Sequence, residues 1–219
     1  MSAEHQASNQ QERLADLLRS AAIIPILTIE RVEDAVPLAR ALIAGGICTL
    51  EITLRTTAAV SAAMAIAEQV TEAVVGIGTV LNPQDLARAR TLGAKFTLSP
   101  GATPELLDAA ADSDLAFVPG IATASELMSA LERGFEIVKF FPAVPAGGIA
   151  TLRALAGPFP QARFCPTGGI GDGDVATWLA EPNVLAVGGS FLAPGAEVRS
   201  GNWAAITERA RRVVASLRR

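Results

Sequence analysis

Histidine, tyrosine, lysine and cysteine are the scarcest of the reactive residue types in this 219-residue chain. The single histidine, His5, lies in a polar N-terminal stretch, and there is no tyrosine. Zinc and non-haem iron sites depend on imidazole, and so do Ser-His-Asp and Cys-His nucleophiles. We therefore expect no metal site. Acid–base chemistry has to use a carboxylate, a lysine, a substrate phosphate or water.

Other absences narrow the class of protein. No apolar run approaches the ~20 residues of a membrane span, and the polar N-terminus lacks the apolar core of a signal peptide. The only basic run, at the C-terminus, is typical of a solvated helix face rather than a nucleic-acid interface. We expect a cytoplasmic protein that binds neither membranes nor nucleic acid. The two cysteines, Cys48 and Cys165, lie in or beside apolar runs, which predicts buried free thiols.

The domain organisation is predicted to be simple. Half of the residues are hydrophobic and no Pro/Ser/Gly-rich linker divides the chain, which favours one compact domain over residues 11–219. Residues 1–10 are predicted to be a disordered polar tail. Leucines spaced at i, i+3 and i+4 predict a short amphipathic helix over residues 11–20.

Eight apolar, β-branched runs alternate with Ala/Leu-rich segments of helical length. This alternation predicts parallel βαβ units, and eight units in ~200 residues predict an α/β protein, a (β/α)8 TIM barrel with an extra N-terminal helix. A doubly wound open sheet is the alternative. No Gly-x-Gly-x-x-Gly follows the first run, which argues against a dinucleotide cofactor. The expected strands lie near residues 21–29, 49–53, 74–80, 96–100, 116–121, 137–142, 163–167 and 184–190.

The second expected strand carries polar residues on one face. Thr49, Glu51, Thr53 and Arg55 alternate with apolar residues. A barrel strand should be apolar on both faces, because helices cover one face and the packed interior the other. The pattern therefore predicts a polar site inside the barrel. A Glu51–Arg55 pair with a purely structural role is the alternative.

Lys139 lies within an apolar run, and the chain has only two lysines against sixteen arginines. Burial favours the neutral amine, which is a nucleophile. We predict that Lys139 is that nucleophile, although a lysine spared by chance in a structural role is the alternative. The second lysine, Lys95, precedes a strand, so we expect it at the opposite end of the barrel, in solvent.

Hydroxyls and glycine pairs lie at the ends of other expected strands. Thr79 and Thr167 each offer a hydroxyl to a polar ligand. The last two strands end in Gly168-Gly169 and Gly188-Gly189-Ser190, where barrels of this type commonly bind phosphate on backbone N–H groups. A buried lysine, a carboxylate, a cation and a phosphate site together predict a Schiff-base (class I) aldolase acting on a carbonyl sugar phosphate.

Several long segments resemble a known family. These segments are AGGICTLEITLRT, GIGTVLNPQDL, SPGAT, VPGIATASEL, VKFFPA, RFCPTGGI and GGSFL, and they span about residues 22–192. They are similar to the aldolases of 2-keto-3-deoxy-6-phosphogluconate (KDPG) and 4-hydroxy-2-oxoglutarate (KHG).

The resemblance implies a role for each matching residue. Lys139 would form the Schiff base and Glu51 would be the general acid/base. Arg55, beside Thr79, would hold the pyruvate carboxylate, and Phe141 would pack against the pyruvyl group. Thr167 would contact substrate hydroxyls. Phosphate would bind to Gly168, Gly169, Gly189 and Ser190.

The resemblance also implies a reaction and an assembly. A homotrimer without metal or other cofactor would cleave the phosphorylated 2-keto acid KDPG to pyruvate and D-glyceraldehyde 3-phosphate in the Entner–Doudoroff pathway. KHG and the galactonate epimer of KDPG stay open as substrates, although related galactonate enzymes tend to be apolar at the position of Thr167. A phosphate-binding barrel isomerase or synthase and a non-catalytic scaffold are more distant alternatives. Val144 departs from the family, in which we expect an acidic residue.

Overall fold

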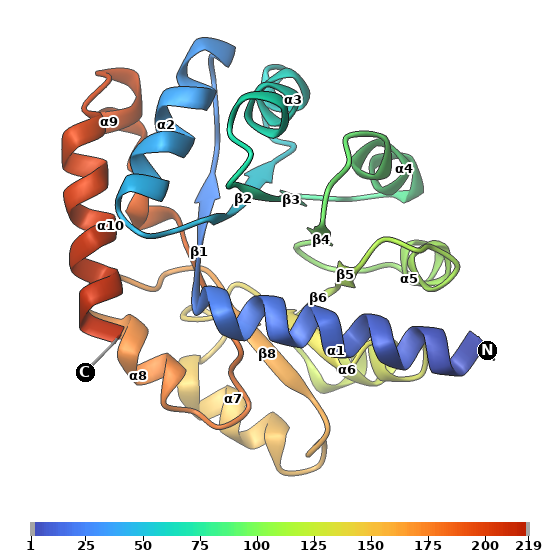
Figure 1. The fold of residues 1–219 in the computed structure, drawn as a ribbon. Helices are drawn as coiled ribbons and strands as arrows, with labels where there is room; N and C mark the ends of the chain where they lie inside the picture. The colour runs from blue at the N-terminus through green and yellow to red at the C-terminus, as the bar shows by residue number, and fades with distance from the viewer. Residues whose placement is uncertain (1–2, 218–219) are drawn as a thin grey trace.

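Parallel β-strands alternate with helices over residues 3–217, the part of the chain that this computed structural model describes. The parallel sheet curls into a half-barrel with helices on its outer face (Figure 1), which confirms the predicted α/β class. The strands are β1 (Ile23–Leu27), β2 (Thr49–Thr53), β3 (Val74–Gly78), β4 (Phe96–Leu98), β5 (Phe117–Val118), β6 (Gly120–Ile121), β7 (Ile137–Phe140), β8 (Arg163–Pro166) and β9 (Val187–Gly189).

The strands are divided between two sheets. One has the order β5-β4-β3-β2-β1-β9 and the other β6-β7-β8. Neighbours in the sheets follow one another along the chain apart from the β1–β9 pair, so the order lacks the reversal of a doubly wound sheet, and that alternative is wrong. Only Pro119 separates β5 from β6, and parallel bridges Phe164–Val184 and Thr167–Gly188 link β8 to the segment of β9.

Helices fill the segments between the strands, as the alternation of runs predicted. Asn82, Thr103 and Thr123 cap α4, α5 and α6 by accepting a backbone N–H three residues later. None of the helices in residues 3–217 is long and apolar enough to cross a membrane. The helices are α1 (Ala3–Ala21), α2 (Val32–Ala44), α3 (Ala59–Gln69), α4 (Pro83–Thr91), α5 (Pro104–Ala111), α6 (Ala124–Leu131), α7 (Gly148–Ala156), α8 (Val175–Leu179), α9 (Gly195–Arg199) and α10 (Trp203–Leu217), with short 3-10 helices η1 (Asp172–Asp174) and η2 (Ser190–Leu192).

The first helix differs from its prediction. We predicted a disordered tail over residues 1–10 and a helix start at Gln11, but α1 begins at Ala3, so residues 3–10 are helical; residues 1 and 2 lie outside the described part of the chain. Ala, Gln and Glu are good helix formers, and lengthening an existing helix is far easier than nucleating one. Further along α1, Leu14 and Leu18 are buried in a cluster with Phe96 and Val118, so this helix covers one end of the strands.

The two cysteines have different environments. Both are free, but Cys48 is exposed, so the prediction that it is buried was wrong. It lies in the loop before β2, outside the apolar part of the strand. Cys165 on β8 is buried as predicted, and burial raises the pKa of its thiol to about 12.

Candidate active site

A buried ion pair joins two strands that are not neighbours in the sheets. The Nζ atom of Lys139, on β7, donates to Oε1 of Glu51, on β2, over 3.1 Å. Only 3 % of the lysine side chain and 1 % of the glutamate side chain are exposed. The structural hypothesis that pairs Glu51 with Arg55 is therefore wrong. Since burying two charges is costly even when they are paired, this pair is a candidate for chemistry rather than for stability.

Gly78 provides the space that the Glu51 carboxylate occupies. Gly78 is the last residue of β3, which pairs with β2, and it lies opposite Thr53 in the register of these two strands. A Cβ atom on Gly78 would lie 2.0 Å from Oε1 of Glu51 and 2.6 Å from its Cδ. Any larger residue would displace the carboxylate oxygen that accepts from Lys139. Gly78 was not predicted as a site residue, although a glycine inside a strand often marks a close approach by another group.

Phe141 lies beside the lysine. Its ring centroid is 5.6 Å from Nζ of Lys139, within the range of a cation–π contact. The ring is half-buried, so it forms one wall next to the amine. This placement agrees with the predicted contact between Phe141 and a group bound to Lys139.

Arg55 and Thr79 meet just beyond the ends of β2 and β3. The Nε atom of Arg55 donates to Oγ1 of Thr79 over 3.0 Å, and the arginine is exposed. Thr79 has a left-handed backbone, with φ of 60°, which is rare for a β-branched residue. Such local strain concentrates at functional sites. The guanidinium keeps further N–H groups that suit a carboxylate.

Thr167 and the two glycine pairs also come together, at the ends of β8 and β9. The bridge from Thr167 to Gly188 aligns these ends, and a Cβ on Gly188 would lie 2.3 Å from the Thr167 hydroxyl. Gly188 therefore leaves space for that hydroxyl, as Gly78 does for Glu51. Gly189 ends β9, and the exposed Ser190 begins η2.

The turn after β8 has backbone N–H groups to offer. Gly168 and Gly169 have φ angles of 101° and 81°, which glycine adopts readily. The carbonyls of Thr167 and Gly168 accept from Ala143 and Val144, over 2.7 and 3.0 Å. Within residues 3–217, no acceptor pairs with the N–H groups of Gly168, Gly169 or Ile170. Successive free N–H groups in a glycine turn are a typical anion site.

Thr53 lies on the polar face of β2, and no role was predicted for it from the sequence. Its hydroxyl donates to the carbonyl of Leu27 over 3.0 Å and lies 3.2 Å from the hydroxyl of Thr28. This hydrogen bond therefore links β2 to β1 two residues beyond Glu51. Lys95 is exposed just before β4, at the other end of the strands, as predicted.

Comparison with known proteins decides the family. A family model described as "Aldolase: KDPG and KHG aldolase" matches residues 14–209. The chain belongs to this family. As a member of the KDPG and KHG aldolase family, it is a carbon–carbon lyase. Its Escherichia coli K12 relative, named KHG/KDPG aldolase, is 47 % identical over 206 residues, which are 94 % of this chain and 97 % of that protein.

Solved structures of KDPG aldolases have the same fold. The enzyme of Legionella pneumophila, with pyruvate captured as a covalent carbinolamine intermediate, superposes with a TM-score of 0.88 and 43 % identity, over 91 % of this chain and 97 % of that one. The enzyme of Zymomonas mobilis ZM4, with 3-phosphoglycerate, gives 0.86 and 42 %, over 90 % and 93 %.

Proposed function

We propose that this chain is a Schiff-base (class I) aldolase that cleaves KDPG to pyruvate and D-glyceraldehyde 3-phosphate. The observation that carries the proposal is the buried contact of 3.1 Å between Nζ of Lys139 and Oε1 of Glu51. An amine and a carboxylate at this distance can exchange a proton, so that the amine becomes a nucleophile and the carboxylic acid a proton donor.

The reaction begins at the keto carbon of the substrate. The neutral amine of Lys139 adds to this carbon and forms a carbinolamine. The protonated Glu51 then gives its proton to the hydroxyl, which leaves as water, and the resulting iminium ion draws electrons from the C3–C4 bond. Glu51 takes the proton of the C4 hydroxyl as that bond breaks and the aldehyde leaves. The same group returns a proton to C3 of the enamine, and water then releases pyruvate from Lys139.

The other predicted residues bind the rest of the substrate. Arg55, held by Thr79 at 3.0 Å, would bind the carboxylate next to the keto carbon. Phe141 would pack against the pyruvyl group. Thr167, on the opposite side, would contact the hydroxyls. The phosphate would bind at Gly168, Gly169, Gly189 and Ser190, a role that the free N–H groups after β8 support.

The finer architecture is part of the proposal. We propose that the strands close into a (β/α)8 barrel, with β5 and β6 acting as one strand broken at Pro119. The bridges between β8 and the segment of β9 support this closure. A homotrimer in the cytoplasm, acting in the Entner–Doudoroff pathway, is what the family resemblance implies. Sedimentation velocity measures the trimer directly.

KHG is a second candidate substrate. The name of the Escherichia coli relative couples KHG with KDPG. KHG presents the same keto acid end to Lys139, Glu51 and Arg55, but it has no phosphate for the turn after β8. Comparing kcat/KM for the two substrates decides which one the site prefers.

Borohydride trapping tests the Schiff base. Pyruvate with borohydride should add a pyruvyl-derived mass at Lys139 alone, as found by peptide mapping. Lys95 is the internal control, because it is exposed and lies before β4, at the other end of the strands. An adduct at Lys95, or no adduct, would overturn the proposed chemistry.

A further inference from the structure

Thr28, the first residue after β1, continues the inward face of that strand. By the two-residue period of a strand it shares this face with Ile26, which lies opposite Glu51 in the register of β1 and β2. The Cδ1 atom of Ile26 is 3.1 Å from the position of a Cβ added to Gly188, and that position also contacts the Thr167 hydroxyl. The inward face of β1 therefore borders the carboxylate on one side and the Thr167 hydroxyl on the other.

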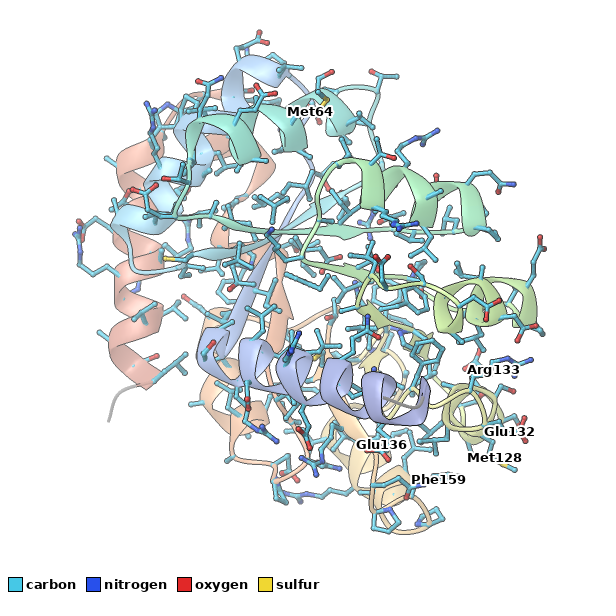
Figure 2. All side chains as sticks on the ribbon, turned by 45° about the vertical axis from the view of Figure 1, so that its right-hand side comes forward. Met64, Met128, Glu132, Arg133, Glu136 and Phe159 are labelled. Carbon is cyan, nitrogen blue, oxygen red and sulfur yellow. The ribbon has the colours of Figure 1, made fainter. Side chains whose placement is uncertain are left out.

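Thr28 is open to solvent at the carboxyl-terminal ends of the strands, whereas Ile26 beneath it is buried. Exposure alone does not indicate a binding residue, because Met128 on α6 is 51 % exposed but projects from the outer surface of the molecule (Figure 2). Thr28 differs in its place in the sheet. There β1 lies between β2, which leads to Arg55, and β9, which ends at the proposed phosphate site. A substrate that extends from Arg55 to the phosphate site passes the end of β1.

The hydrogen bonds around Thr28 determine which role its hydroxyl can play. A hydroxyl has one proton to donate and two lone pairs that accept. The Thr53 hydroxyl donates its proton to the carbonyl of Leu27 over 3.0 Å, because a carbonyl can only accept. In the contact of 3.2 Å between the two hydroxyls, Thr28 is therefore the donor. The proton of Thr28 is thus directed at Thr53, and toward a bound substrate its oxygen acts as an acceptor.

We infer that Thr28 is a specificity-determining residue that accepts a hydrogen bond from the C5 hydroxyl of KDPG. The inference rests on the proposed function. KDPG has hydroxyls on C4 and C5, and the C4 hydroxyl gives its proton to Glu51 during cleavage, so the C5 hydroxyl is the remaining donor. KHG has a carboxylate at C5 instead, and an ionised carboxylate has no proton to donate to Thr28. Thr28 therefore favours KDPG over KHG without any contact to the phosphate.

The test compares two aldehydes in the condensation with pyruvate, which is the reverse of cleavage. D-Glyceraldehyde 3-phosphate supplies the C5 hydroxyl of the product, and 3-oxopropyl phosphate differs from it only in lacking that hydroxyl. Thr28→Val keeps the shape of the side chain but removes the acceptor. It should lower the ratio of the two kcat/KM values roughly 3- to 10-fold, the effect of one hydrogen bond between uncharged groups. The kcat/KM ratio of KDPG over KHG should fall in the same variant.

Two control variants and one partial reaction accompany this test. Thr28→Ser keeps the acceptor and should leave the aldehyde ratio near the wild-type value. Thr91→Val removes a hydroxyl from an exposed residue at the C-terminal end of α4 and should also leave the ratio unchanged. Exchange of pyruvate methyl protons with solvent needs Lys139 but no C5 hydroxyl, so Thr28→Val should exchange at close to the wild-type rate. A threonine that only held Thr53 in place would instead affect exchange and slow both aldehydes alike.

The outcomes separate this inference from the proposed function. An equal loss with both aldehydes in Thr28→Val, an unchanged ratio in that variant, or a fall of the same size in Thr28→Ser would each overturn the inference. Any of these results, with wild-type cleavage of KDPG and pyruvate trapped at Lys139, leaves the proposed function standing. A wild-type protein that neither cleaves KDPG nor traps pyruvate would overturn both.

Discussion

The interior has two ends with opposite chemistry. At the amino-terminal ends of the strands, Leu14 and Leu18 of α1 pack with apolar strand residues. At the carboxyl-terminal ends, the interior holds the buried polar side chains of Glu51, Lys139 and Thr167. Strand β7 belongs to both ends, because Ile137 lies in the apolar cluster and Lys139, two residues later, in the ion pair. Stability and chemistry are thus separated along the strands.

Replacing Lys139 by Met should have the largest effect, because it should change both the chemistry and the stability. Loss of the nucleophile should lower kcat on the order of 10⁴-fold or more. It also leaves Glu51 buried without its cation, so the free energy of unfolding should fall by about 3 to 5 kcal/mol at a pH where the carboxylate is charged. Steady-state kinetics and urea unfolding measure the two effects. Lys95→Met, at the exposed lysine, is the control and should match wild type in both; a kinetic defect there would contradict the assignment.

Glu51→Gln should have the next largest effect. It keeps the size of the side chain but removes the group that moves protons, so kcat should fall roughly 10²- to 10⁴-fold. Exchange of pyruvate methyl protons should fall by a similar factor, because both steps use the same group. Circular dichroism should be unchanged. If pyruvate only binds more weakly while exchange at saturating pyruvate stays normal, the acid/base is water or the substrate phosphate.

Gly78→Ala tests the space behind the carboxylate. The new Cβ would lie 2.0 Å from Oε1 of Glu51, so the carboxylate oxygen that accepts from Lys139 has to move. A displacement of this size should lower kcat roughly 10- to 100-fold. In the Glu51→Gln background the same change should cost much less, because the group that it displaces is already inactive. Gly173→Ala is the control, since no atom lies within 4 Å of its added Cβ. Equal losses in both backgrounds would refute the positioning role.

Leu18→Ala should lower the stability of the protein rather than its activity, and should have the smallest effect on turnover of these variants. Leu18 is fully buried under the strands, and its loss should lower the free energy of unfolding by about 2 to 5 kcal/mol. The kcat of the folded protein should stay close to wild type. Leu81→Ala removes the same atoms from a residue that is 56 % exposed, and should change neither property. A large loss of kcat in Leu18→Ala would show that the two ends are coupled.

Much of the fold and of the site could be predicted because both depend on periodicity. The alternation of runs located the strands, and the two-residue period of a strand placed Glu51 and Lys139 on inward faces. The two-residue period does not show which side chains on different strands form an ion pair, however. Glu51 contacts a lysine 88 residues away instead of the nearby Arg55, and only the curvature of the sheet decides that choice.

Other features depend on single backbone positions that a pattern cannot locate. Pro119 divides a predicted strand into β5 and β6, because proline has no N–H to donate to a neighbouring strand. The left-handed backbone of Thr79 is unexpected for a β-branched residue, and its hydroxyl accepts from Arg55. The exposure of Cys48 could not be predicted because the start of β2 at Thr49, which the pattern located correctly, does not determine which side chains of the preceding loop face solvent.

The glycines of the interior limit how this protein can change over evolutionary time. The Glu51 carboxylate occupies the space next to Gly78, and the Thr167 hydroxyl occupies the space next to Gly188. A single mutation at either glycine therefore meets a side chain that cannot yield without leaving the site. Substitutions there become acceptable only when the partner changes first or at the same time. New substrates are thus more accessible through open positions such as Thr28 than through the interior itself.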